Sequence, residues 1–514
     1  MRFVTPCLLV HLAVASGGHA APPSKADAAG LAVLIDQHIE SRLGGEGLRP
    51  ADLADDAEFL RRVHLDLHGV VPTREQAETF LADSRPDKRA RLVDELLASP
   101  RYGEYLADVW QGYLMSPLAD DLPARSDRLR RWLARQFNVA TWDRIVSGLL
   151  TATGKMEDNP AVTYLIEGRL PRNVPDLTDL TSRYFMGVRL NCAQCHDHPF
   201  ARWKQRDFWG MAAFFAPVQT PARAKQVYQL GVTDNPRLTL SALRDAGMLD
   251  GFVPGAPAFL GEQGKPDGHG ASRAVLARWL TAPENPYFAR AMVNRTWWRL
   301  FGRGIVQPVD DMHEANPPTH PELLDLLAWR FTESGFDLKY ITRAIVLSRA
   351  YQRTSRADGS AGERQAALFG RMQIKVLTAG QLYDSLESAF GPPAKTPGMG
   401  HGGGARWEFT RFFGENGDPD PTAYRRGIPH LLRQMNSAQF GGQNLDALVD
   451  RLAAPGRPTG DVAADLFLTI LSRRPTGREQ SQFQSCMQRA GSAREAYREL
   501  VWALAMTAEF SLNH

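Results

Sequence analysis

The densest group of chemically reactive side chains in this sequence lies between positions 192 and 198. Cys192, Cys195 and His196 form the pattern Cys-x-x-Cys-His, and His198 follows two positions later. This pattern is typical of covalent c-type haem attachment, in which two thiols add to the haem vinyl groups and the histidine binds the iron. The sequence contains only four cysteines. We therefore interpret Cys192, Cys195 and His196 as a candidate site for one haem c.

A haem iron bound by His196 takes a second axial ligand or keeps an open position. Met186 and Met211 flank the motif at distances along the chain that permit a return to the iron, and a methionine opposite a histidine is typical of high-potential haems. Each is also an ordinary core residue. His198 is too close to His196 along the chain to reach the opposite haem face easily, so we expect it to bind a second metal or a local hydrogen-bond partner. An open position would favour binding of a small oxidant.

Two non-haem interpretations compete with this one. Cys192 and Cys195, together with His196 or His198, also suit a tetrahedral structural zinc, with Asp197 placed to orient an imidazole. Alternatively, the two cysteines form a disulfide in an exported scaffold or carbohydrate-associated binding module. Thioredoxin-type exchange is the least favoured, because it expects a preceding strand in a βαβ unit, whereas the pattern around the motif is helical.

A second group of polar residues lies in the later half of the chain. Asp310, Asp311, His313 and His320 fall within eleven positions and could form a hydrolytic or metal site. The favoured interpretation is structural, with the aspartates in loops and His320 in the first turn of a helix. The sequence has no Gly-x-Ser-x-Gly elbow and no His-Glu-x-x-His helix. Whether the protein is an enzyme, and on which substrate, stays open.

The N-terminus has the organisation of a secretory signal peptide. Arg2 is followed by an apolar stretch over 3–15 and by small residues at Gly18 and Ala20, so we expect a signal peptide over 1–20 and a periplasmic or secreted mature protein. The apolar run is too short to favour a membrane span. Cleavage would remove Cys7 and leave Cys486 as the one cysteine outside the motif, which its helical setting predicts to be buried and unreactive.

The overall composition is that of an ordinary globular protein. The 514 residues are 43% hydrophobic and 23% charged, and 60 basic residues nearly balance 57 acidic ones to give a net charge of +3. No long block of one charge sign occurs, so we expect no nucleic-acid partner. The expected partner is a redox protein or another exported protein, of unknown identity.

The elements that must position the motif are predicted to be helices. Apolar residues recur at three- and four-residue spacing along most of the chain, whereas 217–270 is rich in Gly and Pro and irregular. We therefore predict a mainly α protein with two helical domains, over 31–216 and 271–514, joined by that irregular segment. Helices are expected over 31–43, 56–67, 74–83, 86–98, 103–113, 127–150 with a break near Asn138, 177–188, 273–280, 286–301, 321–332, 337–351, 461–471 and 476–512.

Three capping boxes are predicted to begin helices. Each pairs a threonine with a glutamine or glutamate three residues later, and the pairs are Thr73 with Gln76, Thr319 with Glu322 and Thr378 with Gln381.

Several longer motifs resemble a known pair of domains. The stretches Phe59 to Thr73, Arg89 to Tyr105 and Cys192 to Phe200 resemble a secreted, cytochrome-like domain first catalogued in planctomycetes, domain of unknown function fifteen-forty-nine. The second half is similar to its habitual companion, domain of unknown function fifteen-fifty-three; the matching stretches are 283–290, 293–295, 300–304, 308–311, 320–325 and 508–514. The resemblance implies an exported protein whose haem site is Cys192, Cys195 and His196. It implies no established activity.

Overall fold

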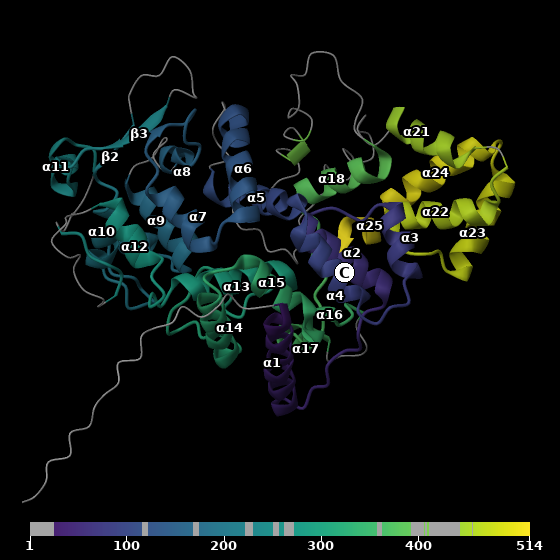
Figure 1. Ribbon diagram of the computed structural model, residues 1–514, viewed down its shortest axis with the longest axis horizontal. Coiled ribbons are helices and arrows are strands. Elements are labelled where there is room, and N and C mark those ends of the chain that lie inside the picture. The colour runs from purple at the N-terminus through teal and green to yellow at the C-terminus, as the bar shows by residue number, and fades with distance from the viewer. Residues whose placement is uncertain are drawn as a thin grey trace, which may run out of the picture.

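Helices form most of the regular structure (Figure 1). The structure, a computed structural model, describes residues 25–115, 122–167, 174–220, 230–249, 256–261, 272–356, 362–391, 406, 409–410, 443–454 and 456–514. The predicted signal peptide lies outside these residues. Within them, no helix is long and apolar enough to cross a membrane. The prediction of a mainly α fold is confirmed.

The first half, up to the cysteine motif and just beyond it, contains the predicted helices and three further ones, α8, η1 and α10. They are α1 (Lys25–Gly45), α2 (Asp56–His68), α3 (Arg74–Ala82), α4 (Lys88–Ala98), α5 (Pro100–Leu114), α6 (Leu122–Val139), α7 (Trp142–Leu150), α8 (Val162–Glu167), α9 (Val174–Met186), the 3-10 helix η1 (Asn191–Gln194) and α10 (Gln205–Ala212). The break expected near Asn138 separates α6 from α7.

The later helices continue to the end of the chain. They are α11 (Leu240–Asp245), α12 (Arg273–Leu280), α13 (Phe288–Phe301), α14 (Pro321–Glu333), α15 (Leu338–Leu347), α16 (Arg349–Gln352), α17 (Gly362–Ala367), α18 (Ala379–Phe390), α21 (Gln443–Leu452), α22 (Thr459–Leu471), α23 (Gly477–Arg489), α24 (Ala493–Ala505) and α25 (Ala508–Ser511). The single stretch expected over 476–512 is thus three helices.

Two of the three predicted capping boxes are confirmed. Thr73 and Thr378 each accept a hydrogen bond from the backbone N–H three residues later, and the glutamine there accepts one from the threonine N–H through its side-chain oxygen. The prediction for Thr319 is wrong. Because α14 begins at Pro321, His320 is the N-cap residue, and the Thr319 hydroxyl instead donates to the carbonyl of Ile305.

Short antiparallel strands join distant parts of the chain. β1 (Gly154–Lys155), β3 (Gly231–Asp234) and β2 (Val218–Gln219) form a small sheet in that spatial order. β4 (Lys375–Val376) pairs with β5 (Leu512–Asn513), with Lys375 opposite Asn513. The described part of 217–270 therefore contains β2, β3 and α11. The domain boundaries stay a prediction.

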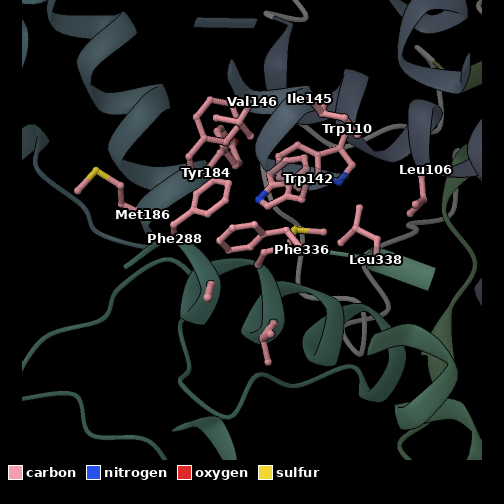
Figure 2. Close-up of a cluster of buried hydrophobic side chains, with 14 of the residues drawn as sticks. Leu106, Trp110, Trp142, Ile145, Val146, Tyr184, Met186, Phe288, Phe336 and Leu338 are labelled. Carbon is pink, nitrogen blue, oxygen red and sulfur yellow. The ribbon is translucent and has the colours of Figure 1, made fainter. Parts of the chain in front are cut away.

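Two hydrophobic cores organise the helices. The larger includes buried residues from α1 through α15, on both sides of 217–270, and the smaller is built mainly from α18 and α21–α25. Helix α2 contributes to both, since Phe59 and Val63 lie in the larger core and Leu65 in the smaller one. In the larger core, rings from α5, α7, α9 and α13 gather around Trp142 (Figure 2). The cysteine motif follows directly after α9.

Candidate functional site

The cysteine motif is a short turn held between α9 and α10. After α9 the chain reverses at Gly187, whose φ of 67° lies in the left-handed region that glycine adopts without strain. The turn η1 follows and contains Cys192. Two side chains of α10 then fix its carbonyls: Trp209 Nε1 donates to the Gln194 oxygen at 3.1 Å, and Gln205 Nε2 donates to the Cys195 oxygen at 3.1 Å. The motif is therefore held to α10 through its backbone carbonyls.

Both thiols of this turn face solvent. Cys192 and Cys195 are free and exposed. Between them, Ala193 is fully buried in the larger core and holds the turn against the protein.

His196 is also exposed, and its hydrogen bond determines which ring nitrogen carries the proton. Its Nδ1 lies 2.7 Å from the carbonyl oxygen of Asp197. Because a carbonyl oxygen only accepts, Nδ1 must donate, and the lone pair of the neutral ring is then on Nε2. Metal-binding histidines commonly donate their second nitrogen to a carbonyl in this way. A neutral His196 therefore has the lone pair of Nε2 available as a metal ligand.

The Asp197 carboxylate is held by residues that follow it. Its oxygen atoms accept from the backbone N–H of Gln205 at 3.0 Å and lie 3.1 Å from Lys204 Nζ. These two interactions lower the pKa of Asp197. The carboxylate thus fastens the turn to the start of α10. The zinc interpretation expected Asp197 to orient an imidazole, but within the described residues its carboxylate has no hydrogen bond to the ring of His196.

His198 has the opposite arrangement of donor and acceptor. Its Nδ1 accepts from the backbone N–H groups of Phe200 at 3.2 Å and Ala201 at 3.0 Å, so Nε2 carries the proton of the neutral ring. Burial lowers the pKa of His198, as do His313 and His196, while the Asp311 carboxylate raises it. With one nitrogen accepting and the other protonated, His198 is the local hydrogen-bonding histidine and a poor metal ligand in this form.

The two methionines lie inside the protein. Met186, at the end of α9, and Met211, in α10, are both 0% exposed and belong to the larger core. Figure 2 shows Met186 at one side of the aromatic group. Either side chain would have to leave the core to reach an iron held by the exposed cysteines.

Most of the aromatic residues after the motif are buried as well. Phe200 is 77% exposed, whereas Trp203, Phe208, Trp209, Phe214 and Phe215 are buried. Most of these rings therefore pack the interior beneath the turn, and only Phe200 lies beside it on the surface.

The polar residues of the second half do not form one cluster. Asp310 is buried and pairs with Arg183 and Arg189. Asp311 and His313 lie beside His198, with the His198 and His313 ring centroids 6.3 Å apart. His320 lies elsewhere: burial, together with Arg42 and His38, lowers its pKa to about 4.

The contact of the 310–313 segment with the cysteine turn was missed by sequence reasoning. No local signal marks it, because the two segments are more than a hundred positions apart.

The burial predicted for Cys486, the cysteine outside the motif, is not what the structure shows. Cys486 is partly exposed, because α23 buries only Phe483 among its residues and leaves Cys486 at the margin of that contact. As for metals, no three His, Cys, Asp or Glu side chains gather in a metal-binding arrangement within the described ranges.

The fold and this turn define a mainly helical protein with an exposed Cys-x-x-Cys-His turn. Comparison with protein families gives two matches: the protein of unknown function DUF1549, also called PSCyt2, over residues 34–220, and the protein of unknown function DUF1553, also called PSD1, over residues 272–401. The chain therefore carries a match to DUF1549 followed by a match to DUF1553. The resemblance noted over 508–514 lies beyond the matched residues. The searches of curated proteins and of solved structures gave no match.

Proposed function

We propose that this is an exported protein carrying one haem c at Cys192, Cys195 and His196, with a role in electron transfer or redox chemistry. The observation that carries the proposal is the joint state of these three residues: two free, exposed thiols and an exposed imidazole whose Nδ1 donates to a carbonyl, leaving Nε2 for a metal. A bound haem would supply a one-electron couple at the protein surface.

The chain's own residues would hold and orient the group. The thiols of Cys192 and Cys195 would attach it, and the Asp197 carbonyl would keep the His196 ring turned with Nε2 outward. Trp209 and Gln205 would keep the turn from moving as the group is attached.

The test is expression with the native leader in a host that has c-haem maturation machinery. We expect sharp absorption bands on dithionite reduction and haem stain that persists on a denaturing gel. Cys192→Ala with Cys195→Ala should abolish the stain, and His196→Gln should alter the spectrum strongly. His198→Asn is the matched control, because the asparagine Oδ1 takes the place of the histidine Nδ1 and can accept the same backbone N–H groups; it should keep both the stain and the spectrum.

A colourless protein that is exported and folded would overturn the haem proposal. Metal analysis and thiol titration of that same sample would then separate the alternatives. Zinc at one equivalent would favour the structural metal, and two missing thiols would favour a disulfide between Cys192 and Cys195.

A further inference from the structure

The segment that leads into the cysteine turn rests on a loop of the companion domain. Residues 183–190 close α9 and run into η1, and residues 308–316 lie in the connection between α13 and α14. The first segment lies within the DUF1549 match and the second within the DUF1553 match. The two segments meet through an ion-pair cluster, a backbone hydrogen bond and a contact between rings.

The ion-pair cluster is centred on the buried carboxylate of Asp310. Arg189 donates to one carboxylate oxygen through Nε at 2.9 Å and Nη2 at 2.6 Å, and Arg183 pairs with the other oxygen. The Asp310 side chain is 1% exposed, whereas the two arginines are partly exposed. These arginines lower the pKa of Asp310 against the opposing effect of burial. A buried carboxylate held in this way fixes Arg189, which lies three residues before Cys192.

The other contacts lie on either side of this cluster. The backbone N–H of Met312 donates to the Gly187 carbonyl at 2.9 Å, at the residue where the chain reverses after α9. Beyond the turn, the ring of His313 faces that of His198. The companion loop thus contacts the cysteine segment before and after the motif.

We infer that Asp310 is a positioning residue for the Cys192–His196 turn, through which the companion domain holds the turn in the geometry needed for attachment of its group. The consequence for haem rests on the proposed function, whereas the positioning itself does not. This inference gives the DUF1553 domain a specific part in the site, because its loop supports the segment that leads into the cysteine turn.

The first experiment uses the full chain without haem, so that positioning is measured by itself. Asp310→Asn keeps the shape of the side chain and removes its charge. We expect amide hydrogen exchange over 187–196 to become at least about tenfold faster, which corresponds to the loss of one charge-assisted hydrogen bond. Exchange in α14 should be unchanged. Asp94→Asn is the matched control, because Asp94 also pairs with a partly buried arginine, Arg343, at 2.7 Å; it should leave 187–196 unaffected.

A second pair of variants covers the case in which Asp310→Asn does not fold. Arg189 is 39% exposed, so its replacement is easier to tolerate. Arg189→Gln should speed exchange over 187–196, whereas Arg189→Lys keeps the charge and should restore most of the protection. Unchanged exchange in Asp310→Asn and Arg189→Gln would overturn the inference.

The haem-matured protein gives the functional readout. In Asp310→Asn we expect at least a severalfold lower ratio of haem to folded protein and a shifted reduction potential, and Asp94→Asn should change neither. A wild-type protein that takes up no haem would refute the proposed function and leave the exchange result standing. Faster exchange combined with normal haem loading and potential would refute the part assigned to Asp310 in the site.

Discussion

Helix α2 and the cysteine turn both concentrate ionisable residues, yet the protein uses them in opposite ways. Eleven of the 13 residues of α2 are buried, including Arg61, Arg62, His64 and Asp66. In the turn, by contrast, Cys192, Cys195 and His196 are all exposed. In α2 the polar groups are directed to other parts of the same chain, whereas two thiols and one imidazole nitrogen of the turn have no such partners among the residues that the structure describes.

The partners of α2 show what its charges do. Asp66 accepts from Lys375 Nζ at 2.6 Å, from Asn513 Nδ2 at 2.8 Å and from the Tyr351 hydroxyl at 2.8 Å. Arg62 pairs with Glu58 at 2.6 Å and donates to the carbonyl oxygen of Tyr351 at 2.8 Å. A motif with histidines and an aspartate at close spacing can therefore be wholly structural. The comparison shows that a high density of ionisable residue types does not by itself separate groups bonded within the chain from groups left exposed at the surface.

The largest expected effect is the loss of stability in Asp66→Ala. Removing the carboxylate leaves the Lys375 ammonium buried without its counter-charge, which costs about 3–5 kcal/mol of unfolding free energy. Urea unfolding followed by circular dichroism measures it. Asp127→Ala, which breaks an exposed pair with Arg131 in α6, should cost less than about 0.5 kcal/mol. Equal losses of unfolding free energy in the two variants would contradict the distinction between buried ion pairs of α2 and exposed ion pairs.

The second prediction concerns acid pH. Burial, with a smaller effect of His68, lowers the pKa of His64 to about 3. The unfolded chain binds this proton near pH 6.5 and the folded chain only near pH 3, so the unfolded state carries more protons between these values. The unfolding free energy should therefore fall as the pH drops through this window, by up to about 1.4 kcal/mol per pH unit for this one group.

The variant His64→Gln should make that slope shallower. Leu60→Val, a loss of one buried methylene in the same helix, is its control and should shift the whole curve without changing the slope. An unchanged slope in His64→Gln would mean that this ring does not stay neutral in the folded protein.

A smaller effect is expected for Tyr351→Phe. This change removes one hydroxyl that donates to Asp66 and keeps the ring, so we expect a loss of about 1–2 kcal/mol. In the background of Asp66→Ala the same change should cost much less, because its acceptor is gone. Additive losses would argue that the hydroxyl is not coupled to the Asp66 carboxylate.

The smallest change in stability is expected at the cysteine turn itself. Because both thiols are exposed, Cys192→Ser with Cys195→Ser should alter the unfolding free energy of the haem-free protein by less than about 0.5 kcal/mol. The same double variant should lose all covalent haem on maturation, and Cys486→Ser should keep it. A large destabilisation of the haem-free protein would mean that the two thiols have a structural role, as the buried polar groups of α2 do.

Local patterns in the sequence predicted much of the helical fold. Helix α12 begins and ends at the predicted residues, and the box of Thr73 and Gln76 begins α3 as expected, because both depend on neighbours within one or two turns. The prediction of a box at Thr319 and Glu322 is wrong for a reason that is also local. Pro321 suits the first helical position and shifts the start of the helix.

The candidate site was predictable only in its local part. Cys192, Cys195 and His196 are recognisable from their spacing, and their role stays a prediction. The burial of Asp66 and the pairing of Asp310 with Arg189 depend on residues that the chain brings together from far away. No periodicity within either segment carries that information.

The contacts of α2 also set an order of events during synthesis. Arg61 donates to the carbonyls of Ile470 and Phe510, and Asp66 accepts from Asn513, which lies 447 positions further along the chain. Until these late residues leave the ribosome, Arg61 lacks its carbonyl acceptors and Asp66 lacks the Asn513 amide. The protein therefore reaches its native state only after almost the whole chain has been translated, and a nascent chain interrupted before β5 should be recognised by chaperones and proteases as unfinished.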